Sequence, residues 1–290
     1  MRIAEHALLG PAPAAIEVTI TVDGRPVPAR AGEPIAIALL AQGIARCRTT
    51  PGAGAPRGLF CGVGRCPDCA MIVDDVLNVR ACVTPARDGM RVETQRGLGH
   101  WGNDERRMTN VESARGAPAD SGAQRERSSL IAHRSSLDSS FVIRHSSFVI
   151  VGAGPAGLAA ALGAARAGAR PLVLDEWPAP GGRLRHTLAK VGGARGVELA
   201  ARLAGRAREA GVEIAPGAVA WGLFAANALA VALGEERAVT LRPETVVLAT
   251  GATDAAAPFP GWTLPGVFLA SAVERAITLH RVLPGSRFLV

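Results

Sequence analysis

Four of the five cysteines in this chain follow a spacing that restricts the fold more than any other feature of the sequence. Cys61, Cys66, Cys69 and Cys82 are separated by four, two and twelve residues. Thiols that bind one metal centre must lie close together, so the twelve residues before Cys82 have to fold back onto the first three cysteines. We therefore expect a tight loop over 61–69 and a small hairpin that brings the last cysteine to it.

The intervals between the first three cysteines match the plant-type [2Fe–2S] run. Two ferric ions bridged by sulfide need four thiolates and backbone N–H groups that point at the sulfur atoms. Gly62 and Gly64 let the loop curl so that its amides can face inward. The alternative is a structural zinc site with four cysteine ligands, in which Cys-x2-Cys pairs dominate, and this chain has one such pair. The spacing favours a [2Fe–2S] site with all four cysteines as ligands.

The fifth cysteine, Cys47, lies outside this pattern, and we expect it to be a small buried residue, with a substitute ligand as the alternative. Five cysteines within 36 positions of a 290-residue chain do not suggest a secreted disulfide framework. The N-terminus is a poor secretory signal, and no run approaches the roughly 20 apolar residues of a membrane span. We expect a cytoplasmic protein without a membrane span.

The formal net charge of +7 does not point to nucleic acid. Lys190 is the only lysine, so arginine supplies nearly all of the positive charge. The arginines are scattered, no basic stripe carries interleaved aromatic residues, and the chain has no tyrosine. We expect no nucleic-acid partner.

Short strands and one helix are expected around the cysteines. Asp23-Gly24 and Asp74-Asp75 separate apolar runs and are typical of hairpin turns, whereas the Gly- and Pro-rich segment 47–69 reads as a loop. An α+β domain is therefore predicted over 1–96, followed over 97–146 by a flexible Ser- and Arg-rich linker with a heptapeptide repeat. The predicted strands are 16–22, 26–30, 70–73, 76–79 and 90–94, and the predicted helix is 35–41.

A resemblance supports this interpretation. The run Pro56-Arg57-Gly58-Leu59-Phe60-Cys61-Gly62-Val63-Gly64-Arg65-Cys66-Pro67-Asp68-Cys69 resembles the small [2Fe–2S] domain of sarcosine oxidase α subunits. The same domain occurs in hydrogen cyanide synthase and in multi-subunit amino-acid and opine dehydrogenases. The resemblance covers residues 16–96 and implies a ferredoxin-like β-grasp domain.

The second half of the chain begins with a strand–loop–helix pattern. The run Gly152-Ala153-Gly154-Pro155-Ala156-Gly157 follows an apolar strand over 148–151 and opens an alanine-rich helix over 155–167. Such a loop lets the backbone approach a pyrophosphate at the helix N-terminus. Asp175 ends the next strand, and we expect it to accept hydrogen bonds from a ribose diol, a role that the neighbouring Glu176 could share.

The glycine loop alone does not decide between FAD and NAD. The segments Pro180-Gly181-Gly182-Arg183 and Val246-Val247-Leu248-Ala249-Thr250-Gly251-Ala252 resemble flavoproteins with two dinucleotide-binding domains, such as pyridine nucleotide–disulfide oxidoreductases. The resemblance implies that FAD is the cofactor and that Gly182, Arg183, Thr250 and Gly251 contact it. No Cys-x-x-Cys lies near the loop, so a disulfide-reductase mechanism is not expected, and we assign no catalytic residue.

Residues 287–290 resemble the first strand of a second nucleotide-binding domain. The resembling flavoproteins carry a Gly-Asp pair in a later piece of the FAD domain, and this sequence has no such dipeptide. We therefore expect the FAD-binding domain over 147–290 to be truncated. The predicted fold class is an α+β ferredoxin-like [2Fe–2S] (β-grasp) domain followed by an incomplete α/β Rossmann-type FAD-binding domain.

Together these features imply an iron–sulfur flavoprotein oxidoreductase that moves electrons between FAD and a [2Fe–2S] cluster as part of a larger enzyme. The family resemblance implies oxidation of an amine or amino acid alongside other subunits of a hetero-oligomeric dehydrogenase. Two alternatives stay open, a non-catalytic electron-transfer module and a truncated non-functional fragment. The sequence identifies neither the substrate nor the electron acceptor.

Overall fold

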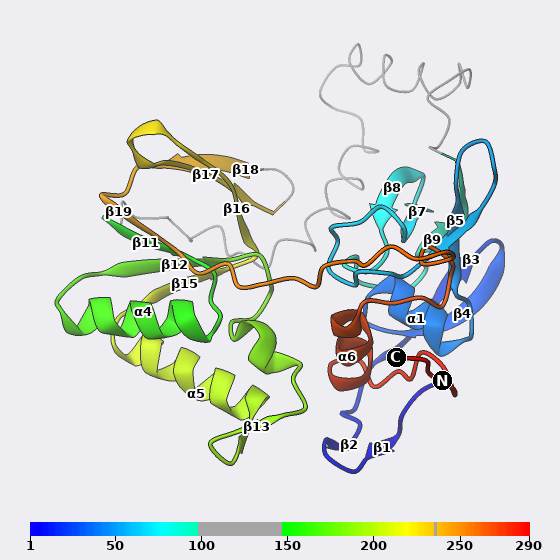
Figure 1. The fold of residues 1–290 in the computed structure, drawn as a ribbon, viewed down its shortest axis with the longest axis horizontal. Helices are drawn as coiled ribbons and strands as arrows, with labels where there is room; N and C mark the ends of the chain where they lie inside the picture. The colour runs from blue at the N-terminus through cyan, green and yellow to red at the C-terminus, as the bar shows by residue number, and fades with distance from the viewer. Residues whose placement is uncertain (98–146, 235–236) are drawn as a thin grey trace, which may run out of the picture. The chain divides into compact units, whose positions relative to one another are not determined.

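The computed structural model describes residues 1–97, 147–234 and 237–290, so the predicted linker lies outside the described residues apart from Gly97. The chain divides into two compact units (Figure 1). The first unit is Met1–Asn103 together with Thr253–Val290, and the second is Asp104–Ala252. None of the described helices has both the length and the apolar character needed to cross a membrane.

A five-stranded mixed sheet forms the centre of the first unit. Ile20 and Val22 are buried while their neighbours along the strand are less so, which is the alternation of a half-covered sheet. The predicted turn at Asp23-Gly24 is present, with positive φ at both residues. The strands in spatial order are β4 (Arg25–Arg30), β3 (Glu17–Val22), β9 (Arg91–Glu93), β7 (Ala70–Val73) and β8 (Val76–Arg80).

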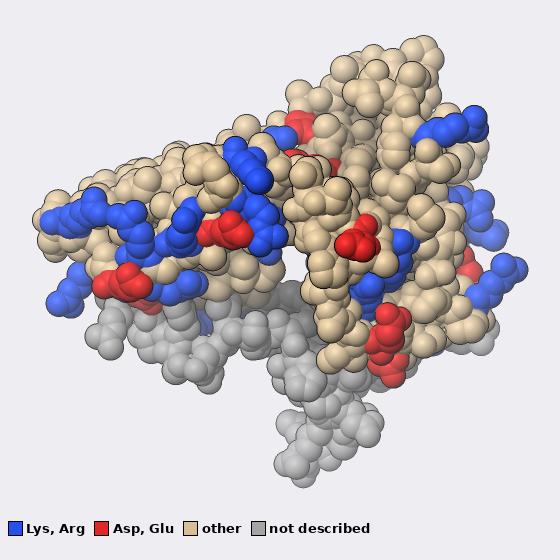
Figure 2. All heavy atoms as spheres, turned by 90° about the horizontal axis from the view of Figure 1, so that it is seen from below, with Lys and Arg blue, Asp and Glu red and all other residues tan. Residues whose placement is uncertain are grey.

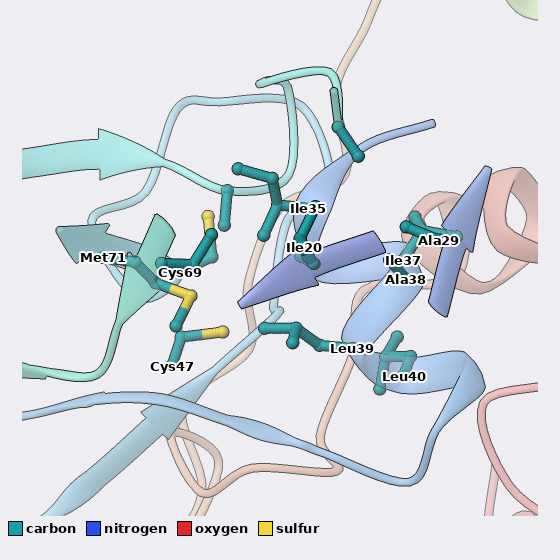
Figure 3. Close-up of a cluster of buried hydrophobic side chains, with 14 of the residues drawn as sticks. Ile20, Ala29, Ile35, Ile37, Ala38, Leu39, Leu40, Cys47, Cys69 and Met71 are labelled. Carbon is teal, nitrogen blue, oxygen red and sulfur yellow. The ribbon is translucent and has the colours of Figure 1, made fainter. Parts of the chain in front are cut away.

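Helix α1 (Ile35–Ala41) packs against this sheet and has the predicted bounds. Its residues 35–40 are all buried because the helix is apolar on every side. Gly43 takes a positive φ just past the helix, and the Ile44 amide donates to the Leu39 carbonyl, which ends the helix. With a parallel pairing of β3 and β9 next to antiparallel neighbours, the unit is a β-grasp fold. Figure 3 shows part of its core.

The cysteine-rich segment is not wholly a loop, contrary to the prediction for 47–69. Strands β5 (Arg46–Thr49) and β6 (Pro56–Gly58) pair antiparallel, and β10 (Gln95–Arg96) pairs in parallel with β5. The prediction is wrong for these stretches because the short polar runs show no apolar alternation, and β10 lies far along the chain. The irregular part of the segment follows β6 and contains the first three cysteines.

A four-stranded parallel sheet forms the centre of the second unit. When the four strands are numbered by their order in the chain, they lie side by side in the order 3-2-1-4. This is the order found at the start of a Rossmann fold. The strand predicted at 148–151 and the strand that Asp175 ends are both present. The strands in spatial order are β15 (Glu213–Pro216), β12 (Pro171–Asp175), β11 (Phe148–Val151) and β19 (Thr245–Leu248).

The two faces of this sheet are covered differently. Ile150 and Val173 belong to the core that includes helices α4 (Pro155–Arg166) and α5 (Gly196–Glu209). Val149, one residue away, belongs to the core of the opposite face, because successive strand residues point to opposite sides. An antiparallel sheet covers that face and consists of β16 (Ala218–Phe224), β17 (Ala228–Leu233) and β18 (Arg237–Leu241).

Helix α5 is amphipathic, with Ala200, Ala204 and Ala207 buried and arginines on its exposed side. On the face of the molecule drawn in Figure 2, basic side chains stand among acidic ones. The remaining short elements are β1 (Glu5–His6), β2 (Gly10–Pro11), β13 (Lys190–Val191), β14 (Ala194–Arg195), η1 (Gly182–Arg185) and η2 (Ala225–Asn227).

The C-terminal segment lies in the first unit, although the sequence places it in the FAD-binding domain. It contains helix α6 (Ala270–Thr278), which the sequence did not predict. Ala276 and Val282 are fully buried in the core of the β-grasp unit, and this burial explains the grouping. The strand expected at 287–290 is not present; those residues have no regular structure.

Candidate functional site

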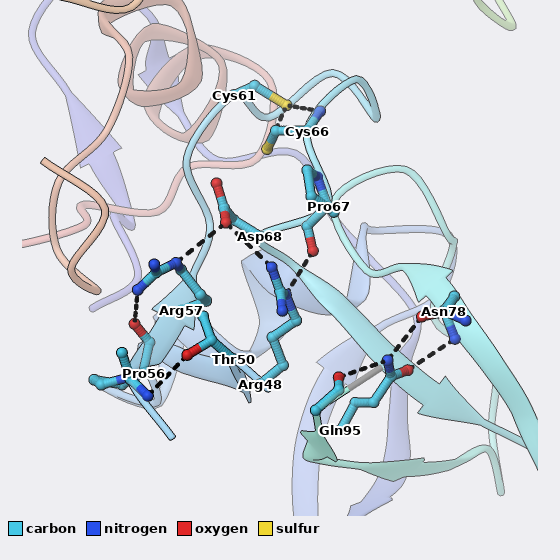
Figure 4. Close-up of polar contacts among 12 residues, drawn as sticks. Arg48, Thr50, Pro56, Arg57, Cys61, Cys66, Pro67, Asp68, Asn78 and Gln95 are labelled. Atoms are coloured by element: carbon cyan, nitrogen blue, oxygen red, sulfur yellow. Dashed lines mark hydrogen bonds and ion pairs between the residues drawn. The ribbon is translucent and has the colours of Figure 1, made fainter. Parts of the chain in front are cut away.

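The four spaced cysteines converge in the first unit. The Sγ atoms of Cys61 and Cys66 are 3.2 Å apart (Figure 4). The Cys82 thiol donates to both Cys61 and Cys69, so hydrogen bonds link all four cysteines. Cys61, Cys69 and Cys82 are buried and Cys66 is partly exposed. Among the described residues, no three His, Cys, Asp or Glu side chains are placed to hold a single metal ion.

Hydrogen bonds among the four cysteines shift their pKa values in opposite directions. The pKa of Cys61 lies far below its usual value because Cys66 and Cys82 donate to its sulfur. The pKa of Cys69 is lowered because Cys82 donates to it. The pKa values of Cys66 and Cys82 are raised because they are the donors in these pairs. The arrangement stabilises thiolates at two of the four positions, and thiolate is the form that binds metal.

The loop around the cysteines directs backbone amides at sulfur. The Gly64 amide donates to Cys82 Sγ over 3.2 Å, and the Cys66 amide donates to Cys61 Sγ over 3.4 Å. Gly62 and Gly64 have φ of 66° and 76°, which is the left-handed region. A Cβ at Gly64 would also stand 3.2 Å from the Val83 side chain. The expected inward curl of this loop is therefore present.

A buried arginine holds the segment between Cys66 and Cys69. Arg48 Nε donates to the Pro67 carbonyl over 2.8 Å, and Arg48 Nη2 lies 3.5 Å from Asp68 Oδ1 (Figure 4). Arg57 Nε lies 3.6 Å from the same carboxylate oxygen. Sequence reasoning missed this network, because one arginine among many shows no pattern. The pairing of β5 with its neighbours brings Arg48 to the loop.

Cys47 is buried in the hydrophobic core with Cys69 and Met71 nearby (Figure 3). Burial raises the pKa of its thiol to about 12. The expectation that Cys47 is a small buried residue is confirmed.

In the second unit the glycines at 152, 154 and 157 differ in their surroundings. A Cβ at Gly152 would lie 2.3 Å from the Ala249 carbonyl oxygen, and a Cβ at Gly157 would lie 1.9 Å from the Gly152 carbonyl oxygen. These two glycines let strand, loop and helix α4 approach closely. Gly154 precedes the helix, and a Cβ added to it would meet nothing within 4 Å, so that side of its backbone is open to a ligand at the helix N-terminus.

Asp175 braces the glycine loop. The carboxylate accepts a hydrogen bond from the Ala153 amide over 2.6 Å and one from the Trp177 amide over 2.8 Å. Burial raises the pKa of Asp175, and these two amides and the nearby Arg185 oppose the rise. Glu176, the next residue, is exposed. The expected ribose acceptor is thus buried and already engaged with backbone amides, while its neighbour faces solvent.

The other predicted flavin contacts gather near the same loop. The Gly181 amide donates to the Ala153 carbonyl over 2.7 Å, and a Cβ at Gly182 would meet Gly154 Cα at 2.9 Å. Arg183 lies in η1, which begins at Gly182. A Cβ at Gly152 would lie 3.4 Å from Thr250 Cα, so the segment that follows β19 also reaches the loop. Gly251 comes next, with a φ of 72° and nothing near the position of an added Cβ. Arg185, which the sequence did not suggest, is close enough to Asp175 for their charges to interact.

Converging cysteines in a β-grasp unit and a glycine loop on a Rossmann sheet together define an iron–sulfur flavoprotein. Residues 15–97 match the 2Fe-2S iron-sulfur cluster binding domain. Residues 146–290, half of the chain, match the pyridine nucleotide-disulphide oxidoreductase family. The chain belongs to this family of oxidoreductases, and its cofactors are a [2Fe–2S] cluster and FAD.

The most similar proteins include components of several oxidising enzymes. An opine oxidase subunit of Agrobacterium tumefaciens is 37% identical over 47% of this chain and 30% of its own length. The alpha subunit of sarcosine oxidase from Corynebacterium is 27% identical over 94% of this chain and 28% of its own length. The HcnA subunit of hydrogen cyanide synthase from Pseudomonas aeruginosa is 42% identical over 27% of this chain and 75% of its own length. The chain thus spans less than a third of the first two relatives.

A solved structure shares the fold. L-proline dehydrogenase from P. horikoshii superposes with a TM-score of 0.74 over 98% of this chain and 50% of that chain, at 24% identity. The likeness covers both units and is a likeness of fold.

Proposed function

We propose that this chain moves electrons between FAD and a [2Fe–2S] cluster as one subunit of an enzyme that oxidises an amine or amino acid. The observation that carries the proposal is the convergence of four cysteine sulfurs in a chain that also has a pyrophosphate-type glycine loop. When bound, FAD takes up electrons in pairs and the cluster carries them singly, which is why the two are useful together.

The four linked cysteines fit a two-iron cluster, and Cys61, Cys66, Cys69 and Cys82 would be its four ligands. The amides of Gly64 and Cys66 offset negative charge on the sulfurs. Arg48 holds the Cys66–Cys69 segment and adds a positive charge close to it.

The glycine loop and its neighbours fit the dinucleotide. The open backbone at Gly154 and the first amides of α4 would hold the pyrophosphate. Asp175 fixes the loop by accepting from Ala153, and exposed Glu176 accepts from the ribose hydroxyls. The remaining contacts that we propose for FAD are Gly152, Pro155, Ala156, Gly157, Gly182, Arg183, Thr250 and Gly251.

The relatives support our proposal for the class of substrate and for the partners. Two of them are named as oxidases of opine and of sarcosine, which are amino-acid derivatives, and both are named as parts of larger enzymes. Their similarity to this chain supports an amine or amino-acid substrate and a hetero-oligomeric assembly. We propose that this assembly works in the cytoplasm.

The test is visible absorption and EPR spectroscopy of the chain purified without oxygen. We expect flavin bands together with a [2Fe–2S] signal in the reduced protein. Cys66→Ser should abolish the iron signal and keep the flavin bands, since the two sites are built from separate residues. Cys47→Ser is the matched control and should keep both signals.

Two results would contradict the proposal. Bound zinc without iron would overturn the cluster assignment, and cluster without flavin under conditions of excess FAD would overturn the pairing of the two cofactors. Turnover with candidate amines and an artificial acceptor, once both cofactors are present, then tests the substrate class.

A further inference from the structure

The C-terminal segment runs along the cysteine loop of the first unit. We define the strap as residues 253–283. At its start, Arg65 Nη1 donates to Thr253 Oγ1 over 3.4 Å, and Arg65 precedes Cys66. Further along, the Leu269 amide donates to the Phe60 carbonyl over 3.0 Å, and Phe60 precedes Cys61. The strap therefore contacts both residues that directly precede the first two cysteines.

Helix α6 also approaches the cysteine loop. A Cβ at Gly62 would lie 3.0 Å from Ala272 Cβ and 3.1 Å from Ala272 Cα, so the helix backbone faces the loop at the residue after Cys61. Ala272 is 2% exposed. The rings of Phe60 and Trp262 also meet edge to face, with centroids 5.4 Å apart. A side chain at position 62 would therefore press against Ala272, and glycine lets the loop lie close to the helix.

Several contacts fix the strap in place. Asp254 accepts from the Ser271 amide over 2.7 Å, which ties the start of the strap to the first turn of α6. Val282 is fully buried in the β-grasp core and forms a bridge with Arg2. The Leu283 amide donates to the Met1 carbonyl over 2.9 Å. The strap is thus held at both ends, with α6 between them against the cysteine loop.

We infer that the strap forms one wall of the [2Fe–2S] site and that Ala272 is a positioning residue that keeps the Cys61–Cys66 loop closed against water. This rests on the proposed cysteine ligands. Solvent exposure and hydrogen bonding to sulfur are main determinants of cluster potential. Water stabilises the more negative reduced form, so opening this wall raises the midpoint potential and speeds loss of iron.

The test compares the same substitution at two buried alanines of α6. Ala272→Val adds volume against Gly62, whereas Ala276→Val adds it one turn away, where the helix packs into the hydrophobic core. The readouts are the midpoint potential from an EPR-monitored titration and the rate of iron transfer to a chelator. For Ala272→Val we expect a higher potential and iron loss about tenfold faster, the scale expected from overpacking a tight contact. For Ala276→Val we expect both values to stay near those of the wild type.

Two results would overturn the inference. One is an unchanged midpoint potential and rate of iron loss in Ala272→Val. The other is an equal change in Ala272→Val and Ala276→Val, which would show that α6 is loosened as a whole. If Ala272→Val folds poorly, Ala272→Gly and Ala276→Gly ask the same question by removing the contact. Absence of a [2Fe–2S] signal in the wild type would instead overturn the proposed ligands, so the two failures are distinguishable.

Discussion

Asp175 at the end of β12 accepts a hydrogen bond of 2.6 Å from the backbone amide of Ala153 in the glycine loop. This bond joins the second strand of the Rossmann sheet to the turn after the first strand. The Gly181 amide completes the junction by donating to the Ala153 carbonyl. The shape of the loop therefore depends on residues up to 28 positions away, counted from Ala153 to Gly181.

Asp175→Asn and Glu176→Gln should separate loop support from ribose binding. Asparagine has one acceptor oxygen in place of two, so either the Ala153 or the Trp177 amide loses its partner. We expect a loss of about 1–3 kcal/mol in unfolding free energy, with weaker FAD binding. Glu176→Gln should bind FAD more weakly with unchanged stability, because Glu176 is exposed. Thermal denaturation and flavin titration measure the two effects, and wild-type behaviour of Asp175→Asn in both would contradict the bracing role.

The raised pKa of Asp175 predicts the sign of a pH dependence. The usual pKa of the group is 3.8 and burial raises it in the folded state, so the folded protein binds more protons than the unfolded chain just above that value. The stability that the folded protein gains from binding this proton is therefore fully present below the usual pKa of Asp175. It is lost as the pH rises through the pKa of Asp175 in the folded protein. Urea denaturation from about pH 4 to about pH 7 should show wild type losing stability relative to Asp175→Asn. If the wild type instead gained stability relative to Asp175→Asn over this range, the two amides would lower the pKa of Asp175 more than burial raises it.

Alanine at Gly154 and alanine at Gly163 should have different effects, the first on FAD affinity and the second on the stability of α4. Gly154 has open space, so Gly154→Ala should fold normally but place a methyl group where the pyrophosphate approaches. We expect FAD affinity to fall by about tenfold or more. Gly163 is exposed within α4 and also has open space, so Gly163→Ala should stabilise the helix by about 1 kcal/mol and leave FAD binding unchanged. Equal FAD affinity in the two variants would place the pyrophosphate elsewhere.

Arg48→Lys tests the support of the cysteine loop. Lysine keeps the charge but lacks the Nε donor that reaches the Pro67 carbonyl, and its single ammonium group cannot reach Pro67 and Asp68 in the same geometry. We expect iron loss to a chelator to accelerate, in line with about 1.5–3 kcal/mol for a hydrogen bond that involves a charged group. Arg46→Lys is the control, since Arg46 is exposed on the same strand. Iron loss that is equally fast in both variants would show that the Arg48 geometry is unimportant.

Local sequence patterns were enough for most of the fold. The bounds of α1, the hairpins at Asp23-Gly24 and Asp74-Asp75, and the strand–loop–helix at Gly152 follow from periodicity and turn residues that lie next to one another in the chain. The spacing of the cysteines likewise required their convergence. These features depend on neighbouring residues, so the sequence alone determines them.

The tertiary structure decided what depends on distant segments. Strand β5 forms because β6 and β10 pair with it, and it then brings Arg48 to the Cys66–Cys69 loop. Asp175 matches a ribose acceptor in the sequence, and only the packed loop shows its carboxylate engaged with backbone amides. The strap lies about 200 residues beyond the cysteines that it covers, and no local pattern predicts this contact because it arises from burial of Ala272, Ala276 and Val282 against a separate part of the chain.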